Sequence, residues 1–258
     1  MTSPENTVSD KTPPLAWALV VAGGVGVRFC APHSHHPDKL LATLGGTPLL
    51  VRTMEAFAKA HTIEGIILVA HPDKRVRYNE ILHQYGIQKP LHVVDGGESR
   101  RASVYNGLCA MQTLSNPRMV AVHDAARPLI DPECIDRAVS KLAHSETAQG
   151  VVVGIPIHDT VKRVDSEGSI IQTEDRRSLW RAQTPQVFWL NALKRAHETA
   201  SADLSVTDDS QLIEMTGTGP VETLLGSEFN LKITTPEDLL TAESWLHRHQ
   251  HPHEVHHR

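Results

Sequence analysis

Arg28 and Lys39 are the only arginine and lysine in a long glycine-rich stretch, VVAGGVGVRFCAPHSHHPDKLLATLGG (residues 20–46). The backbone N–H groups of a turn that contains Gly24 and Gly26 can surround a triphosphate, and two cations can neutralise its charge. A single surface arginine or lysine is usually only solvated, but two of them at one turn favour contact with a ligand. The stretch therefore predicts a phosphate-binding loop.

The familiar classes of phosphate loop do not fit this stretch. A dinucleotide-binding turn would have a third glycine where Phe29 stands, and it would open directly into a helix, which Pro32 and Pro37 prevent. His71 and Pro72 follow the second predicted strand, where such a fold would place an acidic residue for the ribose. The G-K-[ST] sequence of an ATP-binding loop is also absent.

Strands and helices alternate along the rest of the chain. Short apolar runs bounded by glycine, proline or polar residues predict buried strands, and TPLLVRTMEAFAKA places Leu50, Met54, Phe57 and Ala58 on one helical face. Repeated strand–helix units with apolar strands predict an α/β fold, with a mainly parallel sheet covered by helices on both faces. Strands are predicted at 16–22, 65–70, 91–97, 119–128 and 150–157, and helices at 47–60, 73–85, 98–112 and from 131 onward.

Ligands of such sheets bind beyond the carboxyl ends of the strands. Four segments lie there: AGGVGVRF, DGGESR, HDAARP and the region that follows GIPI. These segments are where the residues that do chemistry are expected to meet.

Residues 158–180 interrupt the alternation and form what we call the arm. β-Branched residues flank a turn at 165–168, and Ile170–Gln172 is a second short strand, so the arm is predicted to be a β-hairpin. A hairpin with so few apolar residues is not stable alone in water. It is expected to lean on a second subunit, or else to form an edge of its own sheet.

Composition sets limits on the function. The chain has 258 residues and a net charge of −5, which argues against a nucleic-acid-coating surface. The three cysteines are widely spaced, as in a protein of the reducing cytoplasm, and no apolar run is long enough for a membrane helix. We expect one domain over 15–247, a disordered leader at 1–14, and a His-rich tail at 248–258 that is either disordered or metal-binding.

Several motifs occur in a fixed order along the chain: AGGVGVRF…DK, DGGESRRASV, HDAARP, DT-x-K, DR-x(3)-W-x(3)-TPQ-x-F, TDD and NLKIT. Together they resemble the 2-C-methyl-D-erythritol 4-phosphate cytidylyltransferases of non-mevalonate isoprenoid biosynthesis. The resemblance covers roughly 17–246 and implies a Rossmann-like fold and a homodimer with exchanged arms. It also implies transfer of a cytidylyl group from CTP to methylerythritol phosphate, with Mg²⁺ or another divalent cation carried mainly by the CTP phosphates and no dedicated protein metal site.

The resemblance also assigns roles to individual residues. Arg28 and Lys39 would stabilise the transition state, Lys232 would lie near the α-phosphate, and Arg176 with Thr160 would reach from the arm into the partner's site. Ser103 would read the cytosine with the backbone around Gly97, although Ser99 or Ser103 could instead cap the following helix. The remaining expected substrate-binding residues are Gly24, Gly26, Glu98, Asp124, Ala125 and Thr184. Asp124 would orient hydroxyls or approach the Mg²⁺, or it would only cap a turn.

The reaction explains why cations dominate this set. A phosphate monoester, whose second pKa is near 6, is already a nucleophilic oxyanion, so catalysis needs positioning and charge stabilisation more than a general base. The loop before Lys39 is longer than is usual in this family, and Glu98 stands where aspartate is common. Another polyol- or sugar-phosphate nucleotidyltransferase, and a nucleotide-binding homologue without catalysis, are the alternatives.

Overall fold

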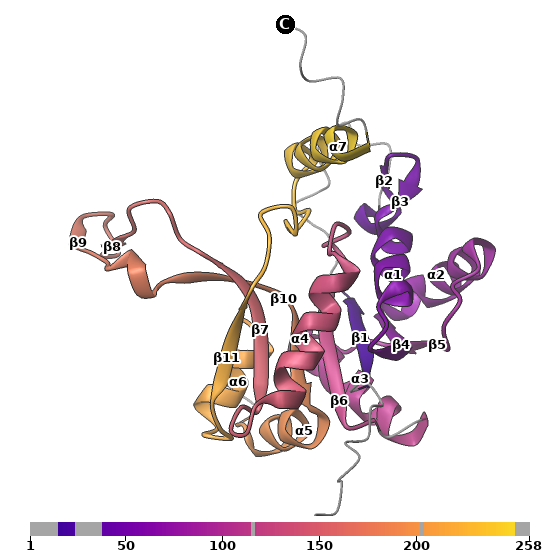
Figure 1. Ribbon diagram of the computed structural model, residues 1–258, viewed down its shortest axis with the longest axis horizontal. Helices are drawn as coiled ribbons and strands as arrows, with labels where there is room; N and C mark the ends of the chain where they lie inside the picture. The colour runs from indigo at the N-terminus through magenta and orange to yellow at the C-terminus, as the bar shows by residue number, and fades with distance from the viewer. Residues whose placement is uncertain (1–14, 24–37, 115–116, 202–203, 251–258) are drawn as a thin grey trace, which may run out of the picture.

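The computed structural model of the chain places most of its strands in one sheet, and it describes residues 15–23, 38–114, 117–201 and 204–250 (Figure 1). The strands are β1 (Ala16–Ala22), β2 (Thr43–Leu44), β3 (Thr47–Pro48), β4 (Ile63–Ala70), β5 (Leu91–Asp95), β6 (Met119–Asp124), β7 (Gly150–Pro156), β8 (Lys162–Val164), β9 (Ile170–Thr173), β10 (Trp180–Trp189) and β11 (Val221–Leu225). The α-helices are α1 (Leu49–Lys59), α2 (Pro72–Tyr85), α3 (Arg100–Leu114), α4 (Pro132–His144), α5 (Leu190–Thr199), α6 (Asp209–Met215) and α7 (Pro236–Gln250), and the 3₁₀ helices are η2 (Lys39–Leu41) and η3 (Arg176–Ser178).

The main sheet has seven strands in the order β11-β7-β10-β6-β1-β4-β5. Its neighbouring strands pair in parallel except β10, which is antiparallel to both β6 and β7. This arrangement confirms the predicted mainly parallel α/β fold, and β1 has the predicted bounds.

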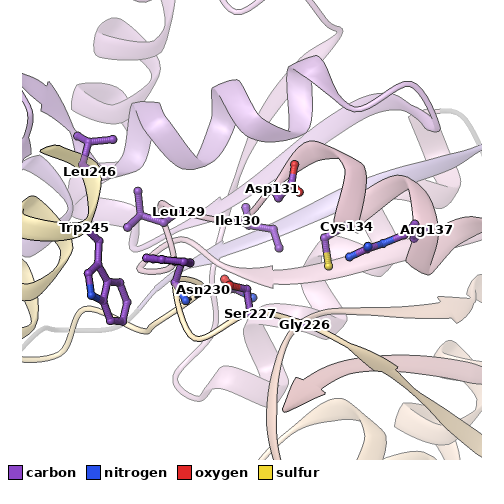
Figure 2. Close-up of a pocket in the computed structure, with 11 residues that line it drawn as sticks. Leu129, Ile130, Asp131, Cys134, Arg137, Gly226, Ser227, Asn230, Trp245 and Leu246 are labelled. Atoms are coloured by element: carbon purple, nitrogen blue, oxygen red, sulfur yellow. Dashed lines mark hydrogen bonds between the residues drawn. The ribbon is translucent and has the colours of Figure 1, made fainter. Parts of the chain in front are cut away.

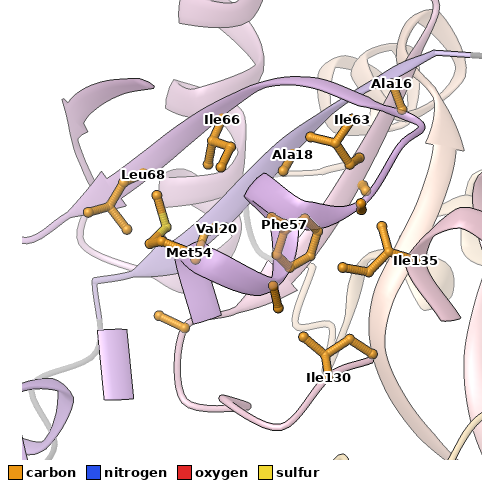
Figure 3. Packing of buried hydrophobic residues seen from close by; sticks show 14 of the residues in the cluster. Ala16, Ala18, Val20, Met54, Phe57, Ile63, Ile66, Leu68, Ile130 and Ile135 are labelled. Carbon is orange, nitrogen blue, oxygen red and sulfur yellow. The ribbon is translucent and has the colours of Figure 1, made fainter. Parts of the chain in front are cut away.

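Both faces of the sheet are covered, because successive side chains of a strand point to opposite sides. Ala18 and Val20 of β1 belong to a buried cluster with residues of α1, α2 and α4, including Met54 and Phe57 (Figure 3). Trp17 and Leu19 of the same strand, among others in the sheet, pack on the opposite face against α3, α5 and α6. Apolar residues on both faces of β1 explain why its sequence is a continuous apolar run.

Strand β10 was not predicted from the sequence. Pro185 lies within it, and a proline cannot donate to the hydrogen-bond ladder, so it argues against a central strand. The structure accommodates it where the pairing of β10 with β7 breaks register, between Ala182 and Gln186. β10 returns the chain from the arm into the sheet.

The arm leaves the sheet between β7 and β10 and carries the small antiparallel pair β8–β9 (Figure 1). Asp165 accepts backbone hydrogen bonds at the turn, and Gly168 has a φ of 87°, which favours glycine. These features confirm the predicted hairpin. Val164, Ile170 and Ile171 are 50–64% exposed, so the arm's apolar side chains are poorly covered by their own chain.

The predicted carboxyl-terminal tail needs one correction. Helix α7 continues to Gln250, so residues 248–250, which were expected to be part of a disordered tail, are helical. Residues 251–258 and the predicted leader, 1–14, lie outside the described residues. In the part of the chain that is described, no helix is long and apolar enough to span a membrane.

Helix α3 lies close against the sheet because Gly107 has no side chain. A Cβ atom at this position would come within 2.7 Å of Leu19 Cδ1 and 2.8 Å of Val69 Cγ2. Both of these side chains are fully buried, so neither can move into solvent. Because α3 begins at Arg100, near the carboxyl ends of the strands, this close packing also fixes the residues at the start of the helix.

We expect Gly107→Ala to destabilise the protein, although alanine favours a helix over glycine by about 1 kcal/mol. Forcing a methyl group into a packed interior usually costs about 1–3 kcal/mol, which outweighs that gain. Urea unfolding followed by circular dichroism should show a lower midpoint. Thr113→Ala, at an exposed position of the same helix, is the control and should stay within about 0.5 kcal/mol of the wild type. A midpoint for Gly107→Ala equal to or above that of the wild type would contradict the close packing.

Candidate active site

A cleft of about 320 Å³ opens beyond the carboxyl ends of β1 and β6, where a sheet of this kind is expected to bind its ligand. Arg28, Gly24 and Gly26 lie outside the described residues. The structure brings together six of the residues predicted from the sequence in the lining of this cleft: Lys39, Gly97, Glu98, Ser103, Asp124 and Lys232.

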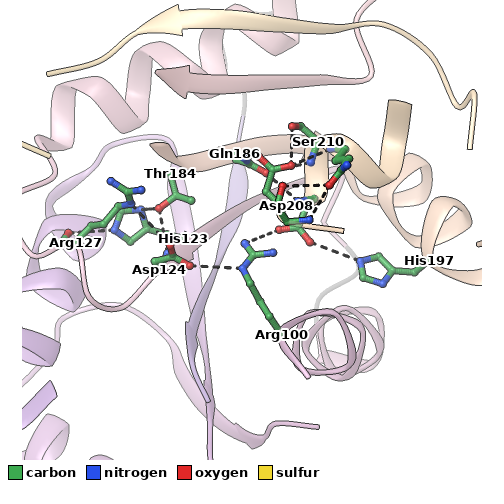
Figure 4. Close-up of polar contacts among 12 residues, drawn as sticks. Arg100, His123, Asp124, Arg127, Thr184, Gln186, His197, Asp208 and Ser210 are labelled. Atoms are coloured by element: carbon green, nitrogen blue, oxygen red, sulfur yellow. Dashed lines mark hydrogen bonds and ion pairs between the residues drawn. The ribbon is translucent and has the colours of Figure 1, made fainter. Parts of the chain in front are cut away.

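The Asp124 carboxylate lies near three cations, and Figure 4 shows its ion pair with Arg100. Its Oδ2 lies 2.8 Å from Lys232 Nζ and 3.8 Å from Arg127 Nε, and its Oδ1 lies 3.6 Å from Arg100 Nε. Burial alone would raise the pKa of Asp124, but Lys232 and Arg100 outweigh it and hold the pKa well below its usual range. The carboxylate is therefore ionised at neutral pH, and such a weak base is poorly suited to general base catalysis.

Arg100 connects the cleft to a second buried carboxylate, that of Asp209. Arg100 Nη2 lies 2.8 Å from Asp209 Oδ2, and His197 Nε2 lies 3.8 Å from Asp209 Oδ1. Burial would raise the pKa of Asp209, but Arg100 and the His197 side chain lower it below its ordinary value. Arg100 was not predicted as a site residue from the sequence. The available signal was the pair of motifs DGGESRR, which contains Arg100, and TDD, which contains Asp209.

The segment between β11 and α7 carries Lys232 and is fastened to the strand ends beneath the cleft. Asn230 Nδ2 donates a hydrogen bond to the Thr184 carbonyl oxygen at 2.8 Å. The Ile233 backbone N–H donates to the Ala126 carbonyl oxygen, also at 2.8 Å. These contacts explain why an asparagine precedes Lys232 by two residues in NLKIT: it ties the lysine's segment to the sheet.

Lys39 is positioned by the residue that precedes it. Asp38 is buried and caps η2 with its side chain, accepts a hydrogen bond from the Tyr78 hydroxyl at 2.8 Å, and lies 3.3 Å from Lys74 Nζ. Lys39 Nζ donates to the Ile233 carbonyl oxygen at 2.8 Å, beside the lysine segment just described. Lys39 therefore lines the cleft despite the lengthened loop before it.

The two serines of the DGGESRRAS motif have different roles. Ser99 Oγ accepts a hydrogen bond from the Ala102 backbone N–H at 3.0 Å, which caps the start of α3. Ser103 Oγ instead accepts from the Gly97 N–H at 3.1 Å and lines the cleft. A Cβ on Gly97 would lie 2.5 Å from the Ala102 Cβ, so only glycine fits there. Glu98 is exposed at the rim.

Ala125 and Thr184 lie beneath the cleft. The Ala125 N–H donates to the Val21 carbonyl oxygen at 3.0 Å, and its own carbonyl oxygen accepts from the Thr53 hydroxyl at 2.9 Å. Thr184 is buried, and its hydroxyl oxygen accepts from the Asp124 N–H at 3.1 Å. Both residues are placed to hold the strand ends that carry the site.

Thr160 and Arg176 do not line the cleft of their own chain. Both are exposed on the arm, which projects away from the main sheet (Figure 1). The Arg176 guanidinium donates a hydrogen bond to the carbonyl oxygen of His158, which is also on the arm.

A second cavity, of about 350 Å³, lies between the start of α4 and the segment after β11 (Figure 2). Its lining is mainly apolar and includes Leu129, Ile130, Phe229 and Trp245. None of the residues predicted to do chemistry lines it. The gathering of charge therefore identifies the cleft beside Asp124 as the candidate active site.

The cleft offers few ligands for a metal ion. Across the described ranges, no group of three or more His, Cys, Asp or Glu side chains is arranged to hold one. The carboxylates in the described lining of the cleft are Asp124 and Glu98. A metal ion in this cleft would need most of its ligands from the substrate.

Known proteins provide an independent comparison. The sequence matches the 2-C-methyl-D-erythritol 4-phosphate cytidylyltransferase (IspD) family over residues 16–248. It is 42% identical to the enzyme of that name from Microcystis aeruginosa, over 88% of this chain and 96% of the relative. It is also 42% identical to the one from Thermosynechococcus vestitus, over 90% of this chain and 96% of the relative.

Solved structures agree with the sequence comparison. The crystal structure of 4-diphosphocytidyl-2C-methyl-D-erythritol synthase from Anaerococcus prevotii superimposes with a TM-score of 0.78 at 28% identity, covering 92% of this chain and 97% of that one. The Francisella tularensis 2-C-methyl-D-erythritol 4-phosphate cytidylyltransferase gives a TM-score of 0.71 at 29% identity, covering 90% and 99%. With its sequence matched over nearly the whole fold and its cations gathered at the strand ends, the chain belongs to the 2-C-methyl-D-erythritol 4-phosphate cytidylyltransferase family.

Proposed function

We propose that the cleft around Asp124 is where this chain carries out the reaction of its family. The chain is a cytidylyltransferase that transfers a cytidylyl group from CTP to 2-C-methyl-D-erythritol 4-phosphate in non-mevalonate isoprenoid biosynthesis. The products are 4-diphosphocytidyl-2-C-methyl-D-erythritol and pyrophosphate. The observation that carries the assignment of the site is the convergence of Lys39, Lys232 and Arg100 on one cleft at the strand ends.

The reaction needs charge stabilisation above all. An oxygen of the methylerythritol phosphate attacks the α-phosphorus of CTP, the new P–O bond forms, and the bond to the departing pyrophosphate breaks. Negative charge grows on the oxygens around the α-phosphorus, and preorganised cations stabilise it. We assign this role to Lys39, Lys232 and Arg28, of which Arg28 lies outside the described residues.

Asp124 holds Lys232 and two neighbouring arginines in place. Its carboxylate holds Lys232 at 2.8 Å and also contacts Arg100 and Arg127, so the cationic side chains are oriented before the substrate arrives. An oxygen of Asp124 can also accept a hydrogen bond from a hydroxyl of the methylerythritol. Ala125 and Thr184 support this strand end from below, through the contacts described above.

The cytosine is assigned to the turn before α3. The backbone at Gly97 is accessible at the cleft and has no side chain to block a base. Ser103 holds that turn through its hydrogen bond with the Gly97 N–H. Glu98 lies at the rim, while Gly24 and Gly26 are assigned to the phosphates.

A divalent cation fits this cleft as a partner of the nucleotide. Mg²⁺ is usually held by one or two carboxylates together with substrate phosphates, and Asp124 is an ionised carboxylate among the phosphate-binding cations. When bound, Mg²⁺ would neutralise part of the triphosphate charge. We propose that it enters with the CTP and is carried mainly by the CTP phosphates.

The arm is assigned to a second copy of the chain. Arg163 and Arg177 of the arm are paired with arm carboxylates, at 2.6 Å from Glu174 and 2.7 Å from Asp175 respectively. Arg176 instead donates to a neutral backbone carbonyl, so its charge suits an external dianion. We propose a homodimer in which Arg176 and Thr160 of each arm bind the methylerythritol phosphate in the partner's cleft. The widely spaced cysteines support a cytoplasmic location.

Pyrophosphate release from CTP, with and without methylerythritol phosphate, tests the function directly. The release should require both substrates, and the nucleotide product should have the mass of the diphosphocytidyl compound. A panel of other nucleotides and sugar phosphates separates this activity from related nucleotidyltransferases. Equal or faster release with a different acceptor would contradict the assignment.

We expect Lys39→Ala to lower kcat by about 10²–10³-fold while changing the KM for CTP only a few-fold, because the lysine acts mainly in the transition state. Steady-state kinetics with varied CTP measures both constants. Lys59→Ala is the matched control, since Lys59 is an exposed lysine at the end of α1, and it should leave both constants unchanged. Near-normal kcat in the Lys39→Ala protein would show that the lysine is not part of the catalytic machinery.

Chelation tests the divalent cation. EDTA is expected to stop pyrophosphate release, and excess Mg²⁺ should restore it, because the triphosphate charge would otherwise be only partly neutralised. EDTA saturated with Mg²⁺ beforehand is the control. The melting temperature should not change with EDTA, because the cation is expected to arrive with the nucleotide. Full activity in metal-free buffer would rule out the requirement.

Complementation tests the shared site. Arg176→Ala and Lys232→Ala proteins should each be nearly inactive, but a mixed dimer contains one site in which both residues are intact. After subunit exchange, activity per heterodimer should recover to about half that of the wild type, by the two-fold symmetry of the dimer. Mass spectrometry of the intact mixture verifies the exchange. If exchange occurs without recovery, or if a monomer is fully active, the arm belongs to its own chain.

A further inference from the structure

His123 is a fully buried histidine directly below the active site. It is the residue before Asp124 in β6 and is 0% exposed. The Phe57 ring packs against the imidazole, with centroids 4.9 Å apart and planes tilted by 60°. Burial lowers the pKa of His123 to about 4, so the ring is neutral at physiological pH.

Both ring nitrogens of His123 have a partner (Figure 4). Nε2 lies 3.2 Å from the Arg127 carbonyl oxygen, and Nδ1 lies 3.0 Å from Thr184 Oγ1. A neutral imidazole carries one N–H donor and one acceptor. Because a carbonyl oxygen only accepts, the proton belongs on Nε2, and Nδ1 must accept from the Thr184 hydroxyl.

The direction of the remaining hydrogen bond follows. The Thr184 hydroxyl has one proton, which is directed to His123 Nδ1. Its oxygen is then oriented to accept the Asp124 backbone N–H, 3.1 Å away. Three hydrogen bonds therefore run in one direction, from the Asp124 N–H through Thr184 and His123 to the Arg127 carbonyl oxygen. They close the turn whose two ends carry the Asp124 carboxylate and the Arg127 guanidinium.

We propose that His123 is a positioning residue for the cytidylyl transfer: it clamps the turn from Asp124 to Arg127 and aligns the Thr184 hydroxyl beneath it. The proposal rests on the function assigned above. The ring does not line the cleft, and it acts through Asp124, which does. Asp124 contacts Lys232, which we place at the α-phosphorus where charge grows in the transition state, and it can accept a hydrogen bond from a methylerythritol hydroxyl. The effect should therefore fall on kcat and on the acceptor more than on CTP binding.

Two substitutions of His123 distinguish the contribution of the Nδ1 hydrogen bond from that of the Nε2 hydrogen bond. Asparagine places an amide oxygen near the position of Nδ1, where it can accept from Thr184. Glutamine places an amide N–H near the position of Nε2, where it can donate to the Arg127 carbonyl oxygen, but leaves the Thr184 hydroxyl without its acceptor. His123→Gln should lower kcat/KM for methylerythritol phosphate by roughly 10- to 100-fold, as small misplacements of site groups do, with the KM for CTP within about threefold of wild type. His123→Asn keeps the acceptor for the Thr184 hydroxyl and should recover most of that loss.

A purely structural role for His123 predicts a different pattern. Phe57→Leu disturbs the packing of the ring without removing a hydrogen bond, so it should lower the melting temperature and leave kcat/KM for the acceptor nearly unchanged. Thr184→Val removes the hydroxyl but keeps the side-chain shape. It should cause the same loss as His123→Gln, and the double variant should lose no more than either single one. Thr184→Val therefore also tests the proposal if His123→Gln does not fold.

The tautomer gives a readout that does not depend on activity. In ¹⁵N-histidine NMR spectra of the full chain at pH 7.5, the His123 signal, identified by its absence from the His123→Asn protein, should show the proton on Nε2. A proton on Nδ1, or wild-type kinetics in both the His123→Gln and Thr184→Val proteins, would overturn the positioning role. An equal rise in the KM for CTP and the KM for the acceptor in the His123→Gln protein would also overturn the positioning role. If the wild-type chain fails to transfer to methylerythritol phosphate, the proposed function fails and this proposal fails with it.

Discussion

The structure of the site depends on one buried negative charge, the Asp124 carboxylate. Several cations in a small cleft repel one another, and a buried carboxylate alone would tend to take up a proton. In this site, the positive charges of Lys232, Arg100 and Arg127 keep Asp124 ionised. The negative charge of Asp124 in turn offsets the repulsion among the three cations and holds them together. A cleft built in this way presents oriented positive charge before any phosphate binds, which is what transfer between two polyanions requires.

The polar contacts around Asp124 also explain how segments far apart in the sequence meet at the end of β6. Arg100 joins the start of α3 to both Asp124 and the start of α6, through Asp209. Asn230 joins the segment before α7 to β10. The sheet supplies the common edge, and Gly107 lets α3 approach closely enough for Arg100 to span the two carboxylates. The polar contacts of the site thus help to hold α3, α6 and the segment before α7 against the carboxyl ends of the strands.

Sequence patterns predicted the parts that depend on local chemistry. An apolar run bounded by proline and glycine gave the bounds of β1, and Lys39, Asp124 and Lys232 meet in one cleft as expected. β10 was not predicted because it contains Pro185, and a proline is not expected within a central strand. The role of Arg100 was not predicted because only the tertiary fold places Asp209 beside it. For Arg28, which lies outside the described residues, and for the shared role of Arg176, the sequence-based assignments remain predictions.

Charge balance shows why this cleft should not work alone. In the described lining of the cleft, three cations, Lys39, Arg100 and Lys232, face two carboxylates, Glu98 and Asp124, which leaves one net positive charge. The methylerythritol phosphate alone brings about −1.5 to −2 charges at pH 7, and the triphosphate of CTP adds several more. Further positive charge must therefore arrive with the substrates or from outside this set. A divalent cation on the nucleotide, Arg28 on the glycine-rich loop, and an arginine on a partner's arm are three independent sources, and each would supply charge at the moment when both phosphates occupy the cleft.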